Sequence, residues 1–392
     1  MRFAALYQAA IDILDQYLNG SNLEVSIKLW GKKNRYAGSS DRRRIRDITF
    51  DIIRQKNSCA YIGGGFTGRQ LIMGYLLLRG SDLDAVFNGS KFAPKKITNT
   101  ERDCFITSYE KIEIYELDYP SWFLPLLKSS LSENFNDYLS VMRYRAMRQL
   151  RINKKKTSRD EVIAALNSEK ILVEPNILVS SGINVLENAH KIMQSDLFLG
   201  GLIEFQDVGS QLISHLIKIK EGDHVLDLCA GSGGKTLAVA SEANKSASYF
   251  AWDENLKRMN DLELRAKRAG VKIVKLSDKP VHAIYDIVII DAPCSGSGSW
   301  RRNPQDKWEL NLESLNANIK IQRKLIQDGL NLVKSDGEII YITCSVLKHE
   351  NETLLNDLMV KNNTFYIREK LSLLPSLQND GFFGAVLKKI SK

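Results

Sequence analysis

The second half of the chain alternates short apolar runs with helical segments, and this pattern constrains the fold more than any other feature. From residue 206 onward, β-rich runs occur at "HVLDLC", "SYFAWD", "KIVKLS", "DIVIID" and "EIIYIT". Helical segments such as "GKTLAVASEAN" and "NLKRMNDLELRAKRAG" lie between most of them. Nearly continuous apolar strands separated by helices are typical of a parallel sheet covered on both faces. We therefore expect a Rossmann-like, doubly wound α/β domain over 206–392, closed by an antiparallel hairpin at "FYIREK" and "FFGAVLKK".

The sequence before residue 206 predicts two further parts. Apolar residues recur at three- and four-residue intervals in "ALYQAAIDILDQYL" and "DRRRIRDITFDIIR", so we expect an all-α domain over 1–117. The stretch from Gly38 to Asp41 offers several candidate caps for the second of these helices. The β-like stretches "QLRIN" and "ILVEP" surround the helical pattern "SRDEVIAALNSE". We therefore expect a small α+β subdomain over 118–205.

Composition restricts where such a chain works. Hydrophobic residues make up 44% and charged residues 26% of the 392 positions, which is typical of a globular protein. No apolar run approaches the roughly 20 residues needed to span a bilayer. The first helix carries Asp12 and Asp15, which a secretory signal would avoid, and the five cysteines include no CxxC pair. We expect a cytoplasmic, monomeric protein with no membrane association, no disulfide framework and no metal site.

Basic residues gather in clusters. Lysine and arginine exceed aspartate and glutamate by 55 to 46, and the excess concentrates at 31–47, 143–156 and 301–307. Trp30, Tyr36 and Tyr144 lie beside or within these clusters. A solvated helix face accounts for any single cluster, but three of them with interspersed aromatic residues favour a polyanionic partner, most simply nucleic acid. The candidate RNA-binding residues are Arg42, Arg43, Arg44, Arg301 and Arg302.

A glycine-rich turn after the first predicted strand indicates a cofactor site. A P-loop would need glycine in place of Cys229, and a dinucleotide fingerprint would need it in place of Thr236, so neither motif is present. Backbone N–H groups at the start of the following helix remain open to a ligand. Asp253, at the end of the second strand, can accept hydrogen bonds from ribose hydroxyls. A nucleoside without pyrophosphate fits best, and S-adenosyl-L-methionine is the obvious candidate.

The candidate cofactor-binding residues come from four strand ends. Asp278 follows the third strand, where its carboxylate could reach an adenine amino group, and Asp291 follows the fourth. The full set is Cys229, Ala230, Gly231, Ser232, Gly233, Gly234, Lys235, Asp253, Asp278 and Asp291.

The chain resembles the Fmu/Sun family of RNA cytosine-C5 methyltransferases. The matching stretches are "QDVGSQL", "DLCAGSGGKT", "DAPCSGSGSWRRNP", "TCSVLKHENE" and "DGFF". Upstream, "RYAGSSDRRRIRD" is similar to the NusB-like RNA-binding domain of the bacterial small-subunit rRNA members, and "RINKKKTSRDEVIAAL" to their middle RNA-binding subdomain. The resemblance covers nearly the whole chain, and the paired PCS and TCS motifs are highly specific.

This resemblance implies a covalent mechanism. Cytosine C5 is a poor nucleophile until a group adds at C6, and a thiolate is well suited to that addition. The residues alone leave open which cysteine attacks, because DNA cytosine methyltransferases use the position of Cys294. The RNA family implies Cys344 as the nucleophile, Cys294 as an aid to product release and Asp291 as the partner of the base at N3.

Two positions depart from the family pattern, and three functions compete. Gly231 and Ser232 stand where the family has alanine and proline, and Gln305 stands where an acid is usual. We expect methylation of a cytidine in 16S-type rRNA. The alternatives are the same chemistry on tRNA, or a non-catalytic RNA-binding or ribosome-assembly factor. The paired cysteine motifs disfavour the last, because a factor that only binds RNA needs neither thiol.

Overall fold

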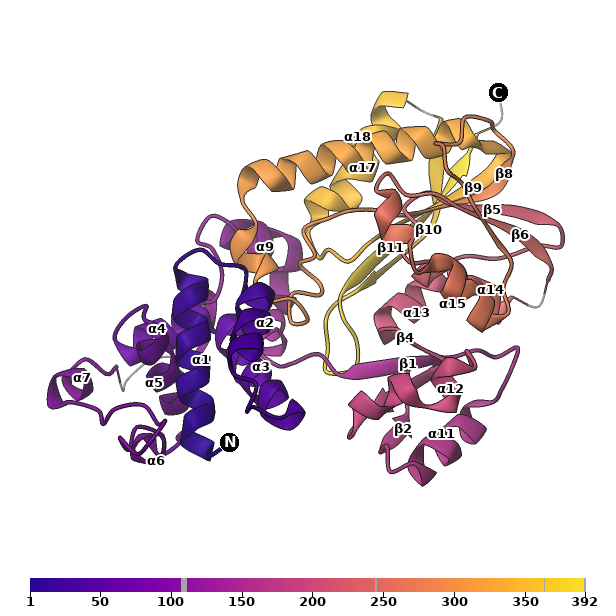
Figure 1. Cartoon of the computed structure of the whole chain (residues 1–392). Coiled ribbons are helices and arrows are strands. Elements are labelled where there is room, and N and C mark those ends of the chain that lie inside the picture. Colours follow the sequence, from indigo (N-terminus) through magenta and orange to yellow (C-terminus); the bar gives the residue numbers. More distant parts are fainter. Residues whose placement is uncertain (107–110, 244, 363, 391–392) are drawn as a thin grey trace. The chain divides into compact units, whose positions relative to one another are not determined.

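The computed structural model describes residues 1–106, 111–243, 245–362 and 364–390 (Figure 1). The chain forms two compact units, a helical unit of Met1–Arg145 and Trp300–Glu309 and an α/β unit of Ala146–Ser299 and Leu310–Lys392. These bounds differ from the expected division after residues 117 and 205. The helices between 118 and 145 remain with the first unit, and the small subdomain belongs with the large sheet. Residues 107–110, 244, 363 and 391–392 fall in the expected domains but lie outside the described residues.

The helical unit confirms the helical character expected of the N-terminal region. Ile13 and Leu14 of the first helix are fully buried and belong to one core with Ile53 and Leu71. The N–H of Gly38, the residue before the third helix, donates to Asp41 Oδ2 at 3.2 Å. The helices are α1 (Phe3–Leu18), α2 (Leu23–Lys33), α3 (Ser39–Arg54), α4 (Lys56–Gly63), α5 (Gly68–Leu77), α6 (Leu83–Val86), α7 (Asn99–Asp103), α8 (Lys111–Leu117), α9 (Leu124–Leu131), η1 (Ser132–Asn134), α10 (Phe135–Val141) and α16 (Asp306–Glu309).

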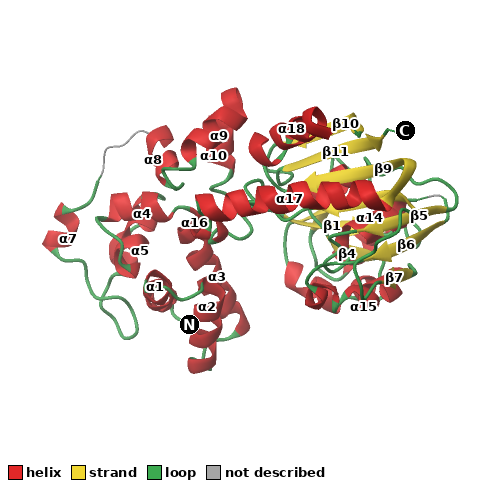
Figure 2. Cartoon of the chain, turned by 90° about the horizontal axis from the view of Figure 1, so that it is seen from above, coloured by secondary structure: helices red, strands yellow, loops and turns green. Residues whose placement is uncertain are grey.

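The segment 300–309 completes the core of the helical unit, although it follows the fourth large-sheet strand in sequence. The ring of Trp300 lies 5.0 Å from that of Phe123, centroid to centroid. The Lys307 ammonium donates to the carbonyl oxygen of Arg54 at 3.1 Å. The Trp308 indole N–H donates to the carbonyl oxygen of Ile53 at 2.9 Å. Figure 2 shows α16 among the helices of this unit.

Gln305 has a structural role in this segment. Its Oε1 accepts a hydrogen bond of 3.3 Å from the N–H of Leu23, the first residue of α2. The first N–H groups of a helix have no intrahelical acceptor, so an outside oxygen stabilises them. An amide oxygen can accept this bond as a carboxylate would, which accounts for Gln305 at a position where the family usually has an acid.

The small subdomain confirms the α+β expectation for the stretch from 148 to 205. Its four-stranded antiparallel sheet has the order β2-β3-β1-β4, and Leu150 and Ile183 lie opposite each other in its core. Ser158 caps the helix, because its hydroxyl accepts from the N–H of Glu161 at 3.3 Å. The elements are β1 (Arg148–Ile152), α11 (Arg159–Ser168), β2 (Val173–Pro175), β3 (Gly182–Val185), η2 (Ala189–Gln194), α12 (Asp196–Leu199) and β4 (Ile203–Phe205).

The large sheet has the order β10-β11-β9-β8-β5-β6-β7 and confirms the doubly wound expectation. β5 to β9 run parallel, and β10 and β11 form the expected antiparallel hairpin. Its strands are β5 (Asp223–Asp227), β6 (Ala247–Ala251), β7 (Ile273–Lys275), β8 (Tyr285–Asp291), β9 (Val333–Thr343), β10 (Phe365–Leu373) and β11 (Phe382–Lys389). The intervening helices are α13 (Val208–Ser214), α14 (Gly234–Glu242), η3 (Leu256–Met259), α15 (Leu262–Ala269), α17 (Leu312–Leu332), η4 (Lys348–Glu350) and α18 (Glu352–Asn362). No helix in the described part of the chain combines the length and apolarity needed to cross a membrane.

Alternate side chains of the central strands enter two different cores. Val288 and Ile290 of β8 pack in the core that also contains buried residues of α17 and α18, whereas Ile287 and Ile289 pack with residues of α13 and α14. Helices therefore cover both faces of the sheet, as Figure 2 shows for α17. After β5 the chain goes on to β6, which lies on one side of β5 in the sheet, whereas β8, later in the chain, pairs with β5 on its other side. The carboxyl ends of β5 and β8 thus form the switch point at which α/β sheets bind ligands.

Candidate active site

The loop between β5 and α14 leaves an open cradle at a helix N-terminus. Gly231 and Gly233 adopt the left-handed region, with φ of 48° and 82°. A Cβ on Gly233 would lie 2.3 Å from Leu262 Cδ1, so this position needs glycine for space as well as conformation. A Cβ on Gly234, the first residue of α14, would meet nothing within 4 Å. Space for a ligand therefore remains beside Gly234, at the N-terminus of α14.

Asp253 connects this loop to the end of β6. It is 3% exposed, and its Oδ2 accepts a hydrogen bond of 2.9 Å from the N–H of Gly231. Its Oδ1 accepts from the N–H of Asn255 at 3.0 Å, and Arg258 forms an ion pair with it at 3.2 Å. Each carboxylate oxygen can accept more than one hydrogen bond, so the group can also receive ribose hydroxyls. Asp278 follows β7 and is exposed, with its Oδ2 accepting from the Ser277 hydroxyl.

The two acids at the adjacent strand ends differ in burial and in partners, since Asp227 is buried and Asp291 is partly exposed. Asp227, at the end of β5, accepts from the Thr236 hydroxyl at 2.6 Å. Burial raises the pKa of Asp227 to about 6, against the lowering effect of that hydrogen bond. Asp291, at the end of β8, accepts from the Lys235 ammonium at 3.0 Å. The cofactor loop is therefore joined to the strand that leads to Cys294.

The two motif cysteines lie together, as expected from their strand ends. Cys294 Sγ and Cys344 Sγ are 3.4 Å apart. The hydrogen bond between the thiols raises the pKa of Cys294 and lowers that of Cys344. The Glu350 carboxylate raises the pKa of Cys294 further, whereas a hydrogen bond from Ser299 and the Lys235 charge lower that of Cys344. The two surroundings therefore make Cys344 the more acidic of the two thiols.

A buried carboxylate that our sequence reasoning missed joins the two cysteine loops. Glu350 is 0% exposed and accepts four hydrogen bonds. Ser295 donates to it through its N–H at 2.8 Å and its hydroxyl at 2.6 Å. The Ser345 hydroxyl donates at 2.5 Å and the Gln322 amide at 3.1 Å. Each serine directly follows one of the cysteines, so the carboxylate fixes the backbone beside both thiols.

Two glycines let a third loop contact the cysteine loops. The N–H of Gly298 donates to the carbonyl oxygen of Cys344 at 2.8 Å, and the N–H of Gly381 donates to that of Gly298 at 2.8 Å. A Cβ on Gly298 would lie 2.3 Å from the Gly381 oxygen. Asp207, the N-cap of α13, also accepts from the N–H of Asp380 at 3.2 Å. The sequence stretches "QDVGSQL", "SGSGS", "TCSV" and "DGFF" therefore meet in space.

The candidate RNA-binding arginines lie in the helical unit and differ in exposure. Arg42 and Arg44 are exposed and Arg43 is half-buried, all on the first turns of α3. Arg302 is half-buried. Arg301 is 2% exposed, so its side chain does not face solvent, and the expectation that it contacts RNA does not fit this structure. Its position within the inserted segment, which packs into the helical core, is the physical reason.

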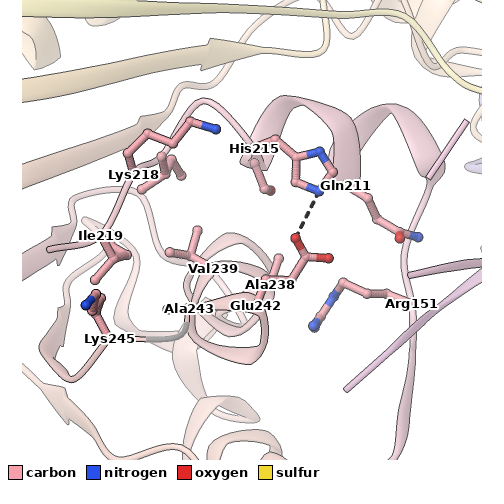
Figure 3. Close-up of a pocket in the computed structure, with 12 residues that line it drawn as sticks. Arg151, Gln211, His215, Lys218, Ile219, Ala238, Val239, Glu242, Ala243 and Lys245 are labelled. Atoms are coloured by element: carbon pink, nitrogen blue, oxygen red, sulfur yellow. Dashed lines mark ion pairs between the residues drawn. The ribbon is translucent and has the colours of Figure 1, made fainter. Parts of the chain in front are cut away.

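The α/β unit contains a pocket of about 440 Å³ (Figure 3). It is lined by Arg151 of β1, by α13 and by the C-terminal end of α14. His215 forms an ion pair of 2.9 Å with Glu242, and Lys154 lies 3.4 Å from the same carboxylate. Because α14 begins at the cofactor loop and ends at this pocket, the pocket lies at the opposite end of the helix from the cysteine site. None of the predicted site residues lines it.

Comparisons with known proteins match the large-sheet region and a stretch that runs from the last helices of the helical unit into the small subdomain. Residues 214–388 match the family model of the 16S rRNA methyltransferase RsmB/F, and residues 119–192 match the ferredoxin-like domain of RsmF/B-like methyltransferases. Ribosomal RNA small subunit methyltransferase B of Escherichia coli is 28% identical over 286 residues, which cover 69% of this chain and 66% of that protein. The protein of the same name from Shewanella oneidensis is 23% identical to this chain over 395 residues, which cover 92% of this chain and 90% of that protein.

Solved structures share the fold. The crystal structure of PH0851 superposes with a TM-score of 0.80 over 99% of both chains at 22% identity. NSun6 from Pyrococcus horikoshii with SFG, an analogue of S-adenosylmethionine, gives a TM-score of 0.60 at 18% identity, over 70% of this chain and 99% of that one. At these identities the likeness shows a common methyltransferase fold.

Proposed function

We propose that this chain, whose residues 214–388 carry an RsmB/F-type methyltransferase domain, transfers a methyl group from S-adenosylmethionine to C5 of a cytidine in RNA. The observation that carries the proposal is the pair of thiols 3.4 Å apart beside an open helix N-terminus. Relatives named rRNA small subunit methyltransferase B favour 16S rRNA as the substrate. The same chemistry on tRNA is the alternative.

In the proposed reaction, Cys344 is the nucleophile. Its lowered pKa favours the thiolate, which adds to C6 of the cytosine as the C5–C6 π bond breaks. Asp291 ends β8, the parallel neighbour of the strand β9 that leads to Cys344, and in the proposed reaction its carboxyl group holds a proton at N3 and stabilises the electrons pushed into the ring. The cofactor, when bound, supplies an electrophilic methyl group to the activated C5 and leaves as the neutral thioether.

Cys294 takes part in the second half of the proposed reaction. After methyl transfer, a water molecule accepts the C5 proton, the electrons of the C5–H bond reform the C5–C6 double bond, and the C6–S bond breaks with its electrons leaving on the Cys344 sulfur. Once released from C6, the sulfur of Cys344 can again form a hydrogen bond with the Cys294 thiol, whose sulfur lies 3.4 Å away. Because hydrogen bonding and the Glu350 charge raise its pKa, Cys294 holds its proton and can donate to the departing thiolate. The two cysteines thus have different tasks despite their similar motifs.

Alanine variants of the two cysteines test this assignment. Cys344→Ala should bind RNA and cofactor but form neither 5-methylcytosine nor a covalent adduct. Cys294→Ala should still attack, and it should accumulate a protein–RNA species that survives denaturing gel electrophoresis, because the later elimination is slow. A covalent species from Cys344→Ala and none from Cys294→Ala would reverse the roles. Bisulfite sequencing of rRNA and tRNA from a deletion strain decides between the two substrates.

The first turns of α3 supply the proposed contact with the RNA backbone. Replacing Arg42, Arg43 and Arg44 together by alanine should weaken RNA binding and flatten its salt dependence, because fewer counterions are released. Cofactor affinity should be unchanged. An unaltered salt slope would leave this basic cluster as a solvated helix face.

A further inference from the structure

The helical unit contains a pocket of about 650 Å³ that the proposed chemistry does not use. Its walls come from one face of α1, from Trp30 and Asn34 at the end of α2, and from two loops that carry Tyr36 and Phe92. This volume falls in the range of pockets that take small organic ligands. All its lining residues belong to the helical unit, so the pocket is complete within that unit.

Three aromatic residues line this pocket. Trp30 is 6% exposed, whereas Tyr36 and Phe92 are both 70% exposed. Phe92 also adopts a left-handed backbone with φ of 71°, which costs about 1–2 kcal/mol for a residue with a side chain. Packing within the unit does not account for two aromatic rings held in solvent, one of them on a strained backbone. Aromatic faces presented in this way are typical of proteins that stack unpaired bases.

Polar groups accompany the rings. Arg2 and Lys91 also line the pocket, and the Lys91 ammonium lies 5.2 Å from the centre of the Phe92 ring. The Gln8 amide donates to Asp12 Oδ1 at 2.8 Å, and burial raises the pKa of Asp12. The Asn34 amide donates to the carbonyl oxygen of Trp30 at 2.9 Å. Amide and carboxyl groups can pair with the edge of a base, while the two cations suit the phosphates attached to it.

We propose that this pocket binds one unstacked nucleobase of the RNA substrate. The inference rests on the proposed function only in taking RNA as the substrate. Three features together favour RNA over a peptide or a lipid: flat aromatic walls, hydrogen-bonding side chains on α1 and α2, and the basic residues that flank Trp30 and Tyr36 in sequence. Stacking on such rings is worth about 1–3 kcal/mol per base, so the site would add to the affinity supplied by backbone contacts.

Aromatic substitutions test the pocket against matched controls. Tyr36→Ala and Phe92→Ala should each lower the affinity for a 16S rRNA transcript by about fivefold or more, from the stacking free energy lost. The controls are Tyr61→Ala and Phe66→Ala, whose side chains are 48% and 58% exposed in the same unit but outside the pocket. Phe92→Tyr should retain wild-type affinity, because the ring is kept on the same backbone.

The salt dependence separates stacking from charge. Tyr36→Ala and Phe92→Ala should leave the salt slope of RNA binding unchanged, because no phosphate contact is removed. Transcripts that contain 4-thiouridine should cross-link to peptides carrying Tyr36 or Phe92. Affinities equal to those of the Tyr61 and Phe66 controls would overturn the proposal. So would a change in self-association, measured by sedimentation, without a change in RNA affinity.

These results are independent of the chemistry proposed for the cysteines. If the aromatic variants lose RNA affinity but the wild-type protein makes no 5-methylcytosine, the pocket stands and the proposed reaction fails. If the wild-type protein methylates RNA and the aromatic variants bind it normally, the reaction stands and the pocket proposal fails.

Discussion

Replacing Glu350 should loosen both cysteine loops at once. The carboxylate accepts four hydrogen bonds, from the N–H and hydroxyl of Ser295, the hydroxyl of Ser345 and the amide of Gln322. In Glu350→Ala the two hydroxyls can rotate toward each other, since their oxygens are 3.2 Å apart. The Ser295 N–H loses its acceptor, and the Gln322 amide loses one of two, because it keeps its hydrogen bond to the carbonyl oxygen of Pro293. Each unsatisfied buried donor costs about 1–3 kcal/mol, so the local destabilisation should be about 2–6 kcal/mol.

Glu350→Gln separates the charge from the shape of the side chain. The amide keeps one oxygen acceptor but places an NH2 group against a donor. We therefore expect a smaller loss of local stability, about 1–3 kcal/mol. Removal of the negative charge should also lower the pKa of Cys294, because that charge contributes to raising it. The matched control is Glu352→Gln, two residues further along the chain. The Oε1 of Glu352 accepts an exposed hydrogen bond of 3.3 Å from the Ser372 hydroxyl.

Hydrogen exchange of the peptide that contains Ser295 measures the local opening free energy, which a whole-chain melting curve of a two-unit protein would blur. The pH profile of thiol alkylation in the same variants reports the pKa of Cys294. If the peptide that contains Ser295 exchanges as slowly in Glu350→Gln as in Glu352→Gln, the hydrogen bonds to Glu350 do not hold the loop. If the alkylation profile is also unmoved, the carboxylate plays no electrostatic part at the thiols.

Three further changes test separate features. Asp253→Ala should lower the affinity for S-adenosylmethionine about tenfold or more in calorimetry, because hydrogen bonds to a charged group are worth about 1.5–3 kcal/mol each; wild-type affinity would remove Asp253 from the site. Gly298→Ala should reduce thermal stability and adduct formation, since its Cβ would lie 2.3 Å from the Gly381 oxygen, whereas Gly234→Ala should keep the fold and weaken cofactor binding. Burial lowers the pKa of Lys307 from 10.5 to about 7. Between pH 7 and pH 10.5 the unfolded state therefore binds more protons than the folded state, so the free energy of unfolding should rise with pH, by at most about 1.4 kcal/mol per pH unit. Denaturant unfolding of Lys307→Met at about pH 7 and about pH 9 should lack this rise, and an unchanged rise would assign it to another group.

The sequence predicts most of the α/β unit because its signals are local. Apolar strands alternate with helices, and the hairpin and the α11 subdomain carry their own periodicity and caps. The meeting of the two cysteines also follows from the sequence, since both end parallel strands that face one crevice.

Other features depend on contacts between distant residues. Nothing in "KHENE" distinguishes the buried Glu350 from the partly exposed Glu352. The stretch "RRNPQDKW" reads as a solvated basic loop, yet Arg301 and Lys307 are buried because their partners come from helices more than two hundred residues earlier. Periodicity within the segment carries no information about such partners. The aromatic pocket is hidden for the same reason, since its walls come from three separate stretches of chain.

The assignment of residues 300–309 to the helical unit has a consequence for how the protein is made. A ribosome delivers the first 145 residues of that unit early, but the piece that carries Trp300 and Lys307 emerges only after β5 to β8 have been synthesised. Until then Phe123 lacks its contact with Trp300, and the carbonyl oxygen of Arg54 lacks the Lys307 ammonium. N-terminal domains usually fold first during translation. This one cannot finish until most of the sheet that bears the first motif cysteine has left the ribosome.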